Sequence, residues 1–360
     1  MRCTNCTPPR NFLISLTLQK ISNFCIGNLI YASKTMNVFI KHKDIFGFVA
    51  LAIIIVILPV FVESKYYYIV LNVIGLNTIV VVGLNLLIGF AGQISLGHAA
   101  FYGLGSYFSG ILTVNYGFPL WPAMLVAMLA TGIVAYLIGY PSLKLKGHYL
   151  VMATLGFGII INILMGELEQ FTGGHDGLIG IPQLAIGGFT FDSDLKNFYL
   201  IWSFVFISML AARNLLNSRV GRALRAVHGS ETAANSLGIN TADYKVKVFV
   251  LSAMFASISG SLYAHYITFI SPSSYDFYYS IQVVTMVIVG GMGSLWGSLF
   301  GAGVLTFISE ALHVAKQYHI IAYGIFLCLV LVFLPEGILV GFYNFILRRK
   351  ARKLIKKVST

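Results

Sequence analysis

Apolar residues dominate this 360-residue chain in long runs that short polar segments interrupt. No Asp, Glu, Lys or Arg occurs in residues 66–143, and shorter charge-free stretches cover 147–166, 197–212, 248–275, 277–309 and 317–335. A helix needs about 20 apolar residues to cross a bilayer, and a charge at the bilayer centre costs about 2.5–3.5 kcal/mol. The pattern therefore predicts an all-α fold, a polytopic bundle of transmembrane helices.

The spacing of these runs predicts about eight to ten crossings of the membrane. The expected spans are residues 45–62, 67–90, 99–114, 120–140, 148–166, 198–216, 248–270, 277–309 and 318–335. Two of these regions are interrupted by glycine, at 89–97 and at 290–294. We expect broken segments there, and residues 277–309 to form either two short crossings or a re-entrant hairpin.

Basic residues predict which side of the membrane each connection faces. They gather beside apolar runs, in the loop 217–247 and in the tail 348–360, and give a formal net charge of +12. Basic loops remain on the cytoplasmic side, so we place both segments there, and by alternation the acidic connection 167–196 lies outside. This distribution, in a chain with only 10% charged residues, indicates lipid contact and argues against nucleic-acid binding.

Three parts of the chain are expected. Residues 1–35 have no signal-peptide pattern, and we expect translation to begin at Met36, the alternative being a cytoplasmic extension. Residues 36–347 form the transmembrane domain, and 348–360 the basic cytoplasmic tail. The four cysteines, Cys3, Cys6, Cys25 and Cys328, match neither a disulfide framework nor a zinc site, so we expect no metal.

Small residues recur every four positions in both glycine-broken regions. The first series is Ser95, Ala99 and Gly103, and the second is Gly293, Gly297 and Gly301. Such spacing lets membrane helices approach closely, and we expect these residues to form helix contact seams.

Polar residues in the first broken region are candidates for a transport path. Irregular backbone at membrane depth is tolerated only inside protein or beside water. Gln93, Ser95, Gly97 and His98 would then line a pathway, although His98 equally fits a packing histidine.

The sequence contains no Gly-x-x-x-x-Gly-Lys-Ser/Thr phosphate loop. We therefore expect no ATPase activity and no cofactor on this chain. Ionisable residues are nearly absent from the expected spans, whereas proton-coupled transporters and intramembrane enzymes place them there.

Four passages carry a resemblance to a known family: GLNLLIGFAGQISLGHAAFYGLGSY (83–107), GHYLVMATLGFG (147–158), TGGHDGLIGIP (172–182) and GGMGSLWGSLFGA (290–302). They resemble permease subunits of bacterial ATP-binding-cassette importers for branched-chain amino acids, a family that also contains urea permeases. The resemblance implies an inner-membrane protein that works with a second homologous permease, two ATPase subunits that bind the ATP, and a periplasmic binding protein.

A fifth passage, VGRALRAVHGSETAANSLGIN (220–240), resembles the loop that such permeases insert into the ATPase subunit. The family pattern is Glu-Ala-Ala-x-x-x-Gly. Here Thr232 occupies the acidic position, Glu231 lies one residue early, and Ala233, Ala234 and Gly238 match. The residues themselves predict a short helix that Ser230 caps and Gly238 ends, which would equally suit an ordinary solvated helix.

The outer connection 167–196 is a candidate docking surface for the binding protein. Thr172, Gly173, Gly174 and Asp176 would form a turn near the mouth of the pathway, or simply a solvated turn. Other functions left open are a urea or other small-solute permease, a stand-alone channel or secondary transporter, and a membrane scaffold without transport.

Overall fold

A computed structural model describes residues 47–59, 64–143, 145, 147–186, 189–312 and 324–325. The chain divides into two units, residues 1–61 and 62–360. In the first unit the described part is one apolar helix, Gly47–Pro59. The second unit holds all the elements discussed below.

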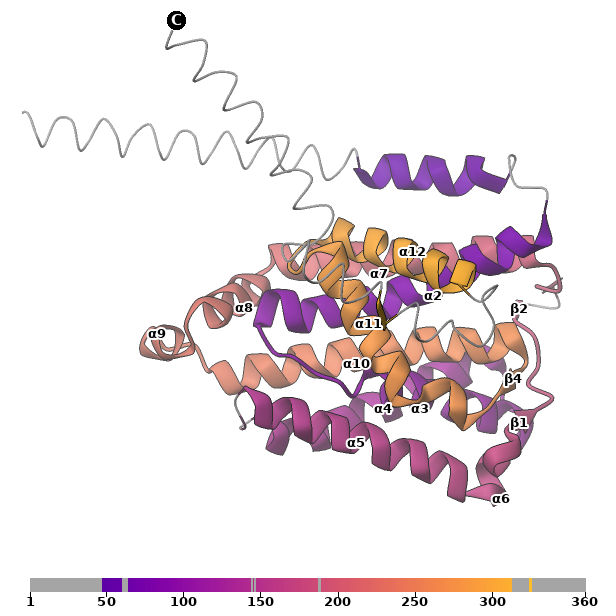
Figure 1. The fold of residues 1–360 in the computed structure, drawn as a ribbon, viewed down its shortest axis with the longest axis horizontal. Coiled ribbons are helices and arrows are strands. Elements are labelled where there is room, and N and C mark those ends of the chain that lie inside the picture. The colour runs from indigo at the N-terminus through magenta and orange to yellow at the C-terminus, as the bar shows by residue number, and fades with distance from the viewer. Residues whose placement is uncertain are drawn as a thin grey trace, which may run out of the picture. The chain divides into compact units, whose positions relative to one another are not determined.

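Helices make up nearly all of the second unit (Figure 1). They are α2 (Lys65–Asn85), the π-helical turn η1 (Leu86–Phe90), α3 (His98–Val114), α4 (Leu120–Ser142), α5 (His148–Glu167), α6 (Glu169–Thr172), the 3₁₀ turn η2 (Gly174–Asp176), α7 (Asp194–Asn217), α8 (Arg219–Gly229), α9 (Glu231–Ser236), α10 (Thr241–Ile267), the 3₁₀ turn η3 (Pro272–Tyr275), α11 (Phe277–Gly290) and α12 (Leu295–Leu312). Six helical segments of the described chain are long and apolar enough to cross a membrane: Lys65–Phe90, α4, α5, α7, α10 and α12. The expected all-α membrane bundle is confirmed.

Helix α2 lies at the centre of the bundle and contacts α7, α10, α11 and α12. Of the apolar core of the segment Lys65–Phe90, 78% is buried, against 28% for that of α5. Helices α4 and α5 instead present large apolar side chains outward, among them Leu125, Leu129, Ile133, Ile160 and Ile163. An outward apolar face of this kind suits contact with lipid.

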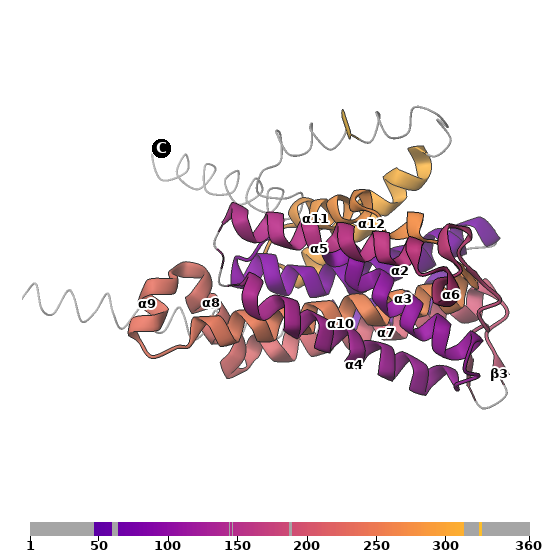
Figure 2. The same cartoon turned by 90° about the horizontal axis from the view of Figure 1, so that it is seen from below.

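The two ends of the bundle differ (Figures 1 and 2). Helices α8 and α9 lie at one end. Four short strands lie at the other: β1 (Leu178–Ile179) pairs antiparallel with β4 (Phe269–Ile270), and β2 (Ala185–Ile186) with β3 (Phe189–Thr190).

The region 277–309 breaks where glycine predicted it. Helix α11 ends at Gly290 and α12 begins at Leu295. The 14 residues of α11 span roughly 21 Å at 1.5 Å per residue, less than a bilayer core, whereas the 18 of α12 are sufficient. The two therefore form a hairpin with unequal arms.

The connection 217–247, expected as a loop with one short helix, is helical almost throughout. It contains α8, α9 and the beginning of α10. The sequence did not predict α8 or the beginning of α10, because the polar segment 217–247 contains no run apolar enough to cross a membrane. The expected span 318–335, the extension 1–35 and the tail 348–360 lie outside the described residues, apart from residues 324–325.

Candidate functional site

The two glycine-broken segments meet inside the bundle. After η1 the chain is irregular over residues 92–97 before α3 begins. Gly89, in η1, packs directly on the backbone of Gly293, and a side chain at Gly89 would overlap the Gly293 amide. Gly291 and Gly293 adopt positive φ angles of 106° and 78°, which only glycine adopts readily. Close approach and backbone reversal together explain the glycine content here.

Asn85 joins the two segments by three hydrogen bonds. Its Nδ2 donates to the Ser294 carbonyl and to Ser298 Oγ, each at 2.8 Å, and its Oδ1 accepts from the Gly293 amide at 2.9 Å. Asn85 is fully buried. Asn85 is not among the residues predicted from the sequence, although an Asn deep in a charge-free span is itself a sign of a polar contact within the membrane.

Of the four residues expected to line a path, Gln93, Ser95 and Gly97 lie in the first broken segment and His98 begins α3, and all four are buried. Gln93 Nε2 donates to the Ala91 carbonyl at 3.3 Å, and Ser95 Oγ accepts from the Gly97 amide at 3.4 Å. A Cβ at Gly97 would come within 2.8 Å of the Thr154 carbonyl of α5. Their role in transport stays a prediction.

His98 is the first residue of α3, and its fully buried side chain reaches α10. Its Nε2 lies 2.7 Å from Ser252 Oγ, and its ring meets Phe101 edge to face at 5.8 Å. Its Nδ1 makes no hydrogen bond within the described part of the chain. This placement matches the packing histidine that the sequence also allowed.

Each expected contact seam holds two of its three residues inside a helix. Ser95 precedes α3, in which Ala99 donates its amide to Ser280 Oγ at 3.1 Å and Gly103 packs against Met165 and Tyr275. Gly293 likewise precedes α12. Gly297 and Gly301 lie against the backbone of α11, where any side chain would overlap the carbonyls of Gly290 and Met286.

A third seam, between α3 and α10, was not expected. Gly105 packs on the backbone of Ser257, and Gly260 on that of Tyr102. Ser106 Oγ donates to the Gly260 carbonyl at 2.8 Å, and Ser261 Oγ to the Gly105 carbonyl at 2.9 Å. Small residues and hydroxyls of this kind hold membrane helices together. The run SISGS at 257–261 is its signature in the sequence.

Helix α9 confirms the predicted short capped helix. Ser230 Oγ accepts from the Ala233 amide at 3.3 Å, and Gly238, at φ +81°, follows the end of the helix. Ala234 is buried, Thr232 and Ala233 are exposed, and Leu237 is 80% exposed. The helix therefore presents a small polar face and one large apolar side chain to its surroundings.

Two contacts fasten α9 to the first turn of α10. Glu231 forms an ion pair with Lys245, whose side chain is buried. Asn235 Oδ1 accepts from the Thr241 amide at 3.4 Å and from Thr241 Oγ1 at 3.1 Å. Glu231 is thus turned toward α10, which leaves Thr232 as the exposed residue at the acidic position of the family pattern.

Helix α8 connects this region to the first glycine break. The His228 ring lies beside Gly92, where a Cβ would come within 2.8 Å of Nδ1, and Gly92 has φ +68°. A movement of α8 would therefore bear directly on the broken segment.

The candidate docking turn lies at the opposite end of the bundle. Thr172 Oγ1 donates to the Leu168 carbonyl at 2.8 Å and accepts from the Gly174 amide at 3.1 Å. Gly173 and Gly174 have φ angles of 76° and 60°, and Asp176 ends η2.

An exposed ion pair lies in the same connection. Lys196 Nζ is 2.6 Å from Asp192 Oδ1, and this hydrogen bond lowers the pKa of the Asp192 carboxyl.

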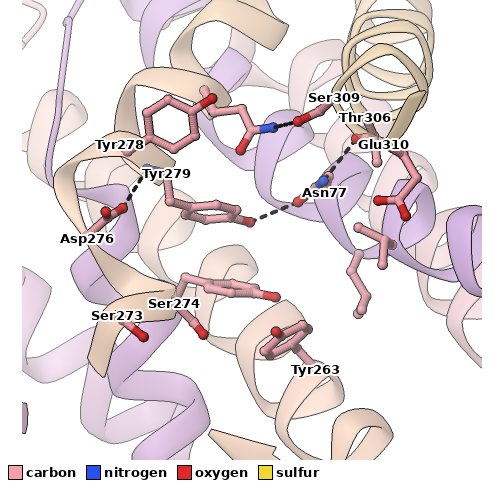
Figure 3. A pocket seen from close by; sticks show the side chains of 14 residues that line it. Asn77, Tyr263, Ser273, Ser274, Asp276, Tyr278, Tyr279, Thr306, Ser309 and Glu310 are labelled. Atoms are coloured by element: carbon pink, nitrogen blue, oxygen red, sulfur yellow. Dashed lines mark hydrogen bonds between the residues drawn. The ribbon is translucent and has the colours of Figure 1, made fainter. Parts of the chain in front are cut away.

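A cavity of about 580 Å³ opens among α2, α3, α10, α11, α12 and the turn η3 (Figure 3). Asn77 stands on its wall, where Nδ2 donates to Thr306 Oγ1 and Oδ1 accepts from the Tyr279 hydroxyl, each at 2.9 Å. No local sequence pattern predicts this cavity, because its lining comes from distant segments; Asn77 and Thr306, for example, are 229 residues apart.

Within the described residues, no group of three or more His, Cys, Asp or Glu side chains is placed to hold a metal ion.

Residues 66–335 match the sequence profile of a family described as a branched-chain amino acid transport system permease component. The high-affinity branched-chain amino acid transport permease proteins LivM of Salmonella typhimurium and Escherichia coli are each 31% identical over 280 residues, which is 71% of this chain and 66% of theirs. The chain thus spans just under two thirds of those relatives. BraD of Pseudomonas aeruginosa, named for the same transport, is 29% identical over 76% of this chain and 96% of its own length. No solved structure is significantly similar.

Proposed function

The chain belongs to the branched-chain amino acid transport permease family, and from this premise we propose that it is the membrane-spanning permease subunit of an ATP-binding-cassette importer. Its substrates are branched-chain amino acids, the class named for its relatives LivM and BraD. The chain forms the path through the membrane and hydrolyses no ATP itself.

One observation carries this proposal: a short helix fixed to a spanning helix at one end of the bundle. Helix α9 exposes Thr232 and Ala233, Leu237 is exposed directly after it, and the Glu231–Lys245 pair holds the helix to α10. A helix that fits a groove on an ATPase subunit must be exposed and must also transmit force. A stand-alone channel has no need of such an element.

The proposed orientation follows the basic residues. Helix α8 carries Arg219, Arg222 and Arg225, so α8 and α9 face the cytoplasm, where ATP is available. The strand-bearing end, with Thr172, Gly173, Gly174 and Asp176, then faces the periplasm and receives substrate from a binding protein. The bundle lies in the inner membrane beside a second homologous permease, and two ATPase subunits bind the ATP.

Purification of the full chain from its own membranes in a mild detergent tests this proposal. The expected result is a complex that retains an ATPase subunit and hydrolyses ATP. Flux of amino acids driven by ions or protons through the purified chain alone would overturn it.

A further inference from the structure

The cavity beside Asn77 is built from parts of five helices and the turn η3, most of which lie toward the strand-bearing end. Its lining comes from the middle of α2, the first turns of α3 and α11, the last turns of α10 and the last described turns of α12, with Ser273 and Ser274 from η3. Its volume of about 580 Å³ falls in the range of small-molecule sites. None of the earlier path candidates at residues 93–98 lines it.

Aromatic rings form one wall of the cavity. The ring of Tyr102 stacks on that of Tyr279 with centroids 4.9 Å apart, and Tyr263 packs against Tyr102 at 5.6 Å. The hydrogen bonds of Asn77 to Tyr279 and Thr306 fix this wall to α2 and α12 (Figure 3). Such a wall offers apolar ring surface to an aliphatic group and negative ring faces to a cation.

The charge in the cavity has one sign. Its lining includes the carboxylates of Asp276 and Glu310 and, within the described part of the chain, no Lys, Arg or His. Asp276 Oδ1 accepts from the Tyr279 amide at 3.1 Å, and Glu310 Oε1 accepts from the Tyr66 hydroxyl at 3.5 Å. Among the described residues, these are the hydrogen bonds that the two carboxylates accept, one oxygen of each being used.

We propose that this cavity receives the primary ammonium group of an amino acid after its release from the binding protein. The carboxylates of Asp276 and Glu310 attract the ammonium group, and the tyrosine wall accommodates the aliphatic side chain. The inference rests on the proposed import function and identifies where the substrate first enters the chain. It also accounts for Glu310, the one charged residue of the otherwise uncharged helix α12.

Charge-selective labelling of one cysteine tests the cavity directly. Ser274, which lines the cavity, is replaced by Cys in a complex in which Cys3, Cys6, Cys25 and Cys328 are changed to Ser. Membrane vesicles are treated with a cationic or an anionic methanethiosulfonate, and each rate is divided by the same reagent's rate with a free thiol. The normalised cationic rate should exceed the anionic rate by at least about tenfold, since a cleft lined by one charge concentrates the opposite charge.

Two variants connect that preference to the named side chains. The substitutions Glu310→Gln and Asp276→Asn keep the shape of both side chains, and an Asn side chain can still cap α11. Together they should therefore remove most of the charge preference without unfolding the chain. Leucine should slow cationic labelling of the Ser274→Cys protein, whereas urea and sodium at the same concentration should not. Equal normalised rates, or a preference that survives both substitutions, would overturn the proposal, as would protection by sodium but not by leucine.

Uptake separates this inference from the function on which it rests. Glu310→Gln with Asp276→Asn should lower the rate of leucine uptake several-fold. If the wild-type chain supports leucine uptake and the variant matches it, the cavity proposal is wrong. If the wild-type chain supports no leucine uptake at all, the proposed function is wrong.

Discussion

Single polar and small residues decide how the helices of this bundle meet. Lipid gives no hydrophobic drive for helix association, so contacts depend on close approach and on hydrogen bonds. Asn85, Gly89 and Gly293 supply both where the two broken segments join. The periodicity of small residues predicted Gly297 and Gly301 correctly as contact residues. Ser95 and Gly293 precede their helices, so the four-residue repeat does not continue through them, and the close contact of Gly293 is with the Gly89 backbone instead.

Replacement of Asn85 by Leu should loosen the junction of the two segments. Three hydrogen bonds are lost, and inside a membrane each contributes roughly 0.6–1.7 kcal/mol. We expect a lower melting temperature in detergent and weakened transport. Asn162→Leu, which removes contacts to η3 at another site, is the matched control for stability. A variant Asn85→Leu that melts and transports like the wild type would contradict the assigned junction.

The seam between α3 and α10 should be sensitive to one methyl group. A Cβ at Gly260 overlaps the Tyr102 carbonyl, whereas one at Gly156 in α5 meets nothing within 4 Å. Gly260→Ala should therefore destabilise the protein by about 1–3 kcal/mol, while Gly156→Ala should be neutral or slightly stabilising. Thermal denaturation of the two purified variants measures the difference. Equal melting temperatures would argue against the seam.

At the scale of elements, the residues at its two ends predicted α9 well, whereas hydropathy did not predict α8 or the first part of α10. Ser230 and Gly238 are cap and stop residues whose effect depends on adjacent positions only, so the helix between them could be read directly. Helices α8 and the first part of α10 were missed because a search for spans passes over polar helices. The attachment of Glu231 to Lys245 depends on the fold and was not predictable from the motif.

Gly238 should be required for coupling rather than for folding. It has φ +81°, and a Cβ there would meet no atom within 4 Å, so a side chain costs about 1–2 kcal/mol of backbone strain and distorts the end of α9. Gly238→Leu should uncouple uptake from ATP hydrolysis. Gly229→Leu, also in open space, serves as the control. Normal uptake by Gly238→Leu would contradict the assignment of α9.

Removal of Glu231 and removal of Lys245, the two partners of the ion pair between α9 and α10, should impair coupling to different extents. Glu231→Gln leaves the buried Lys245 ammonium without a counter-charge, at a cost of up to about 3 kcal/mol, whereas Lys245→Met leaves a partly exposed carboxylate that water can solvate. Glu231→Gln should thus reduce the number of substrates moved per ATP more strongly than Lys245→Met. The measurement is the number of substrates moved per ATP in membrane vesicles that carry each variant. An equal number for the two variants, or a larger loss for Lys245→Met, would count against a mechanical link between α9 and α10.

For the whole molecule, the composition and the length of the charge-free stretches were enough to predict an all-α membrane bundle, and the motifs were enough to indicate the family. These signals can all be read from the sequence alone. The meeting of the two broken segments and the cavity beside Asn77 depend on residues far apart in the chain, such as Asn85 with Ser298 and Asn77 with Thr306. No local pattern carries that information, which explains why the path candidates of the sequence, Gln93 to His98, lie elsewhere than the cavity.

Uptake of labelled leucine, isoleucine, valine and urea, compared in cells with and without this chain, tests the central claim most directly. An importer permease for branched-chain amino acids predicts that removal of the chain lowers uptake of the three amino acids, that its return restores it, and that urea uptake is unchanged. Loss of urea uptake alone would contradict the account.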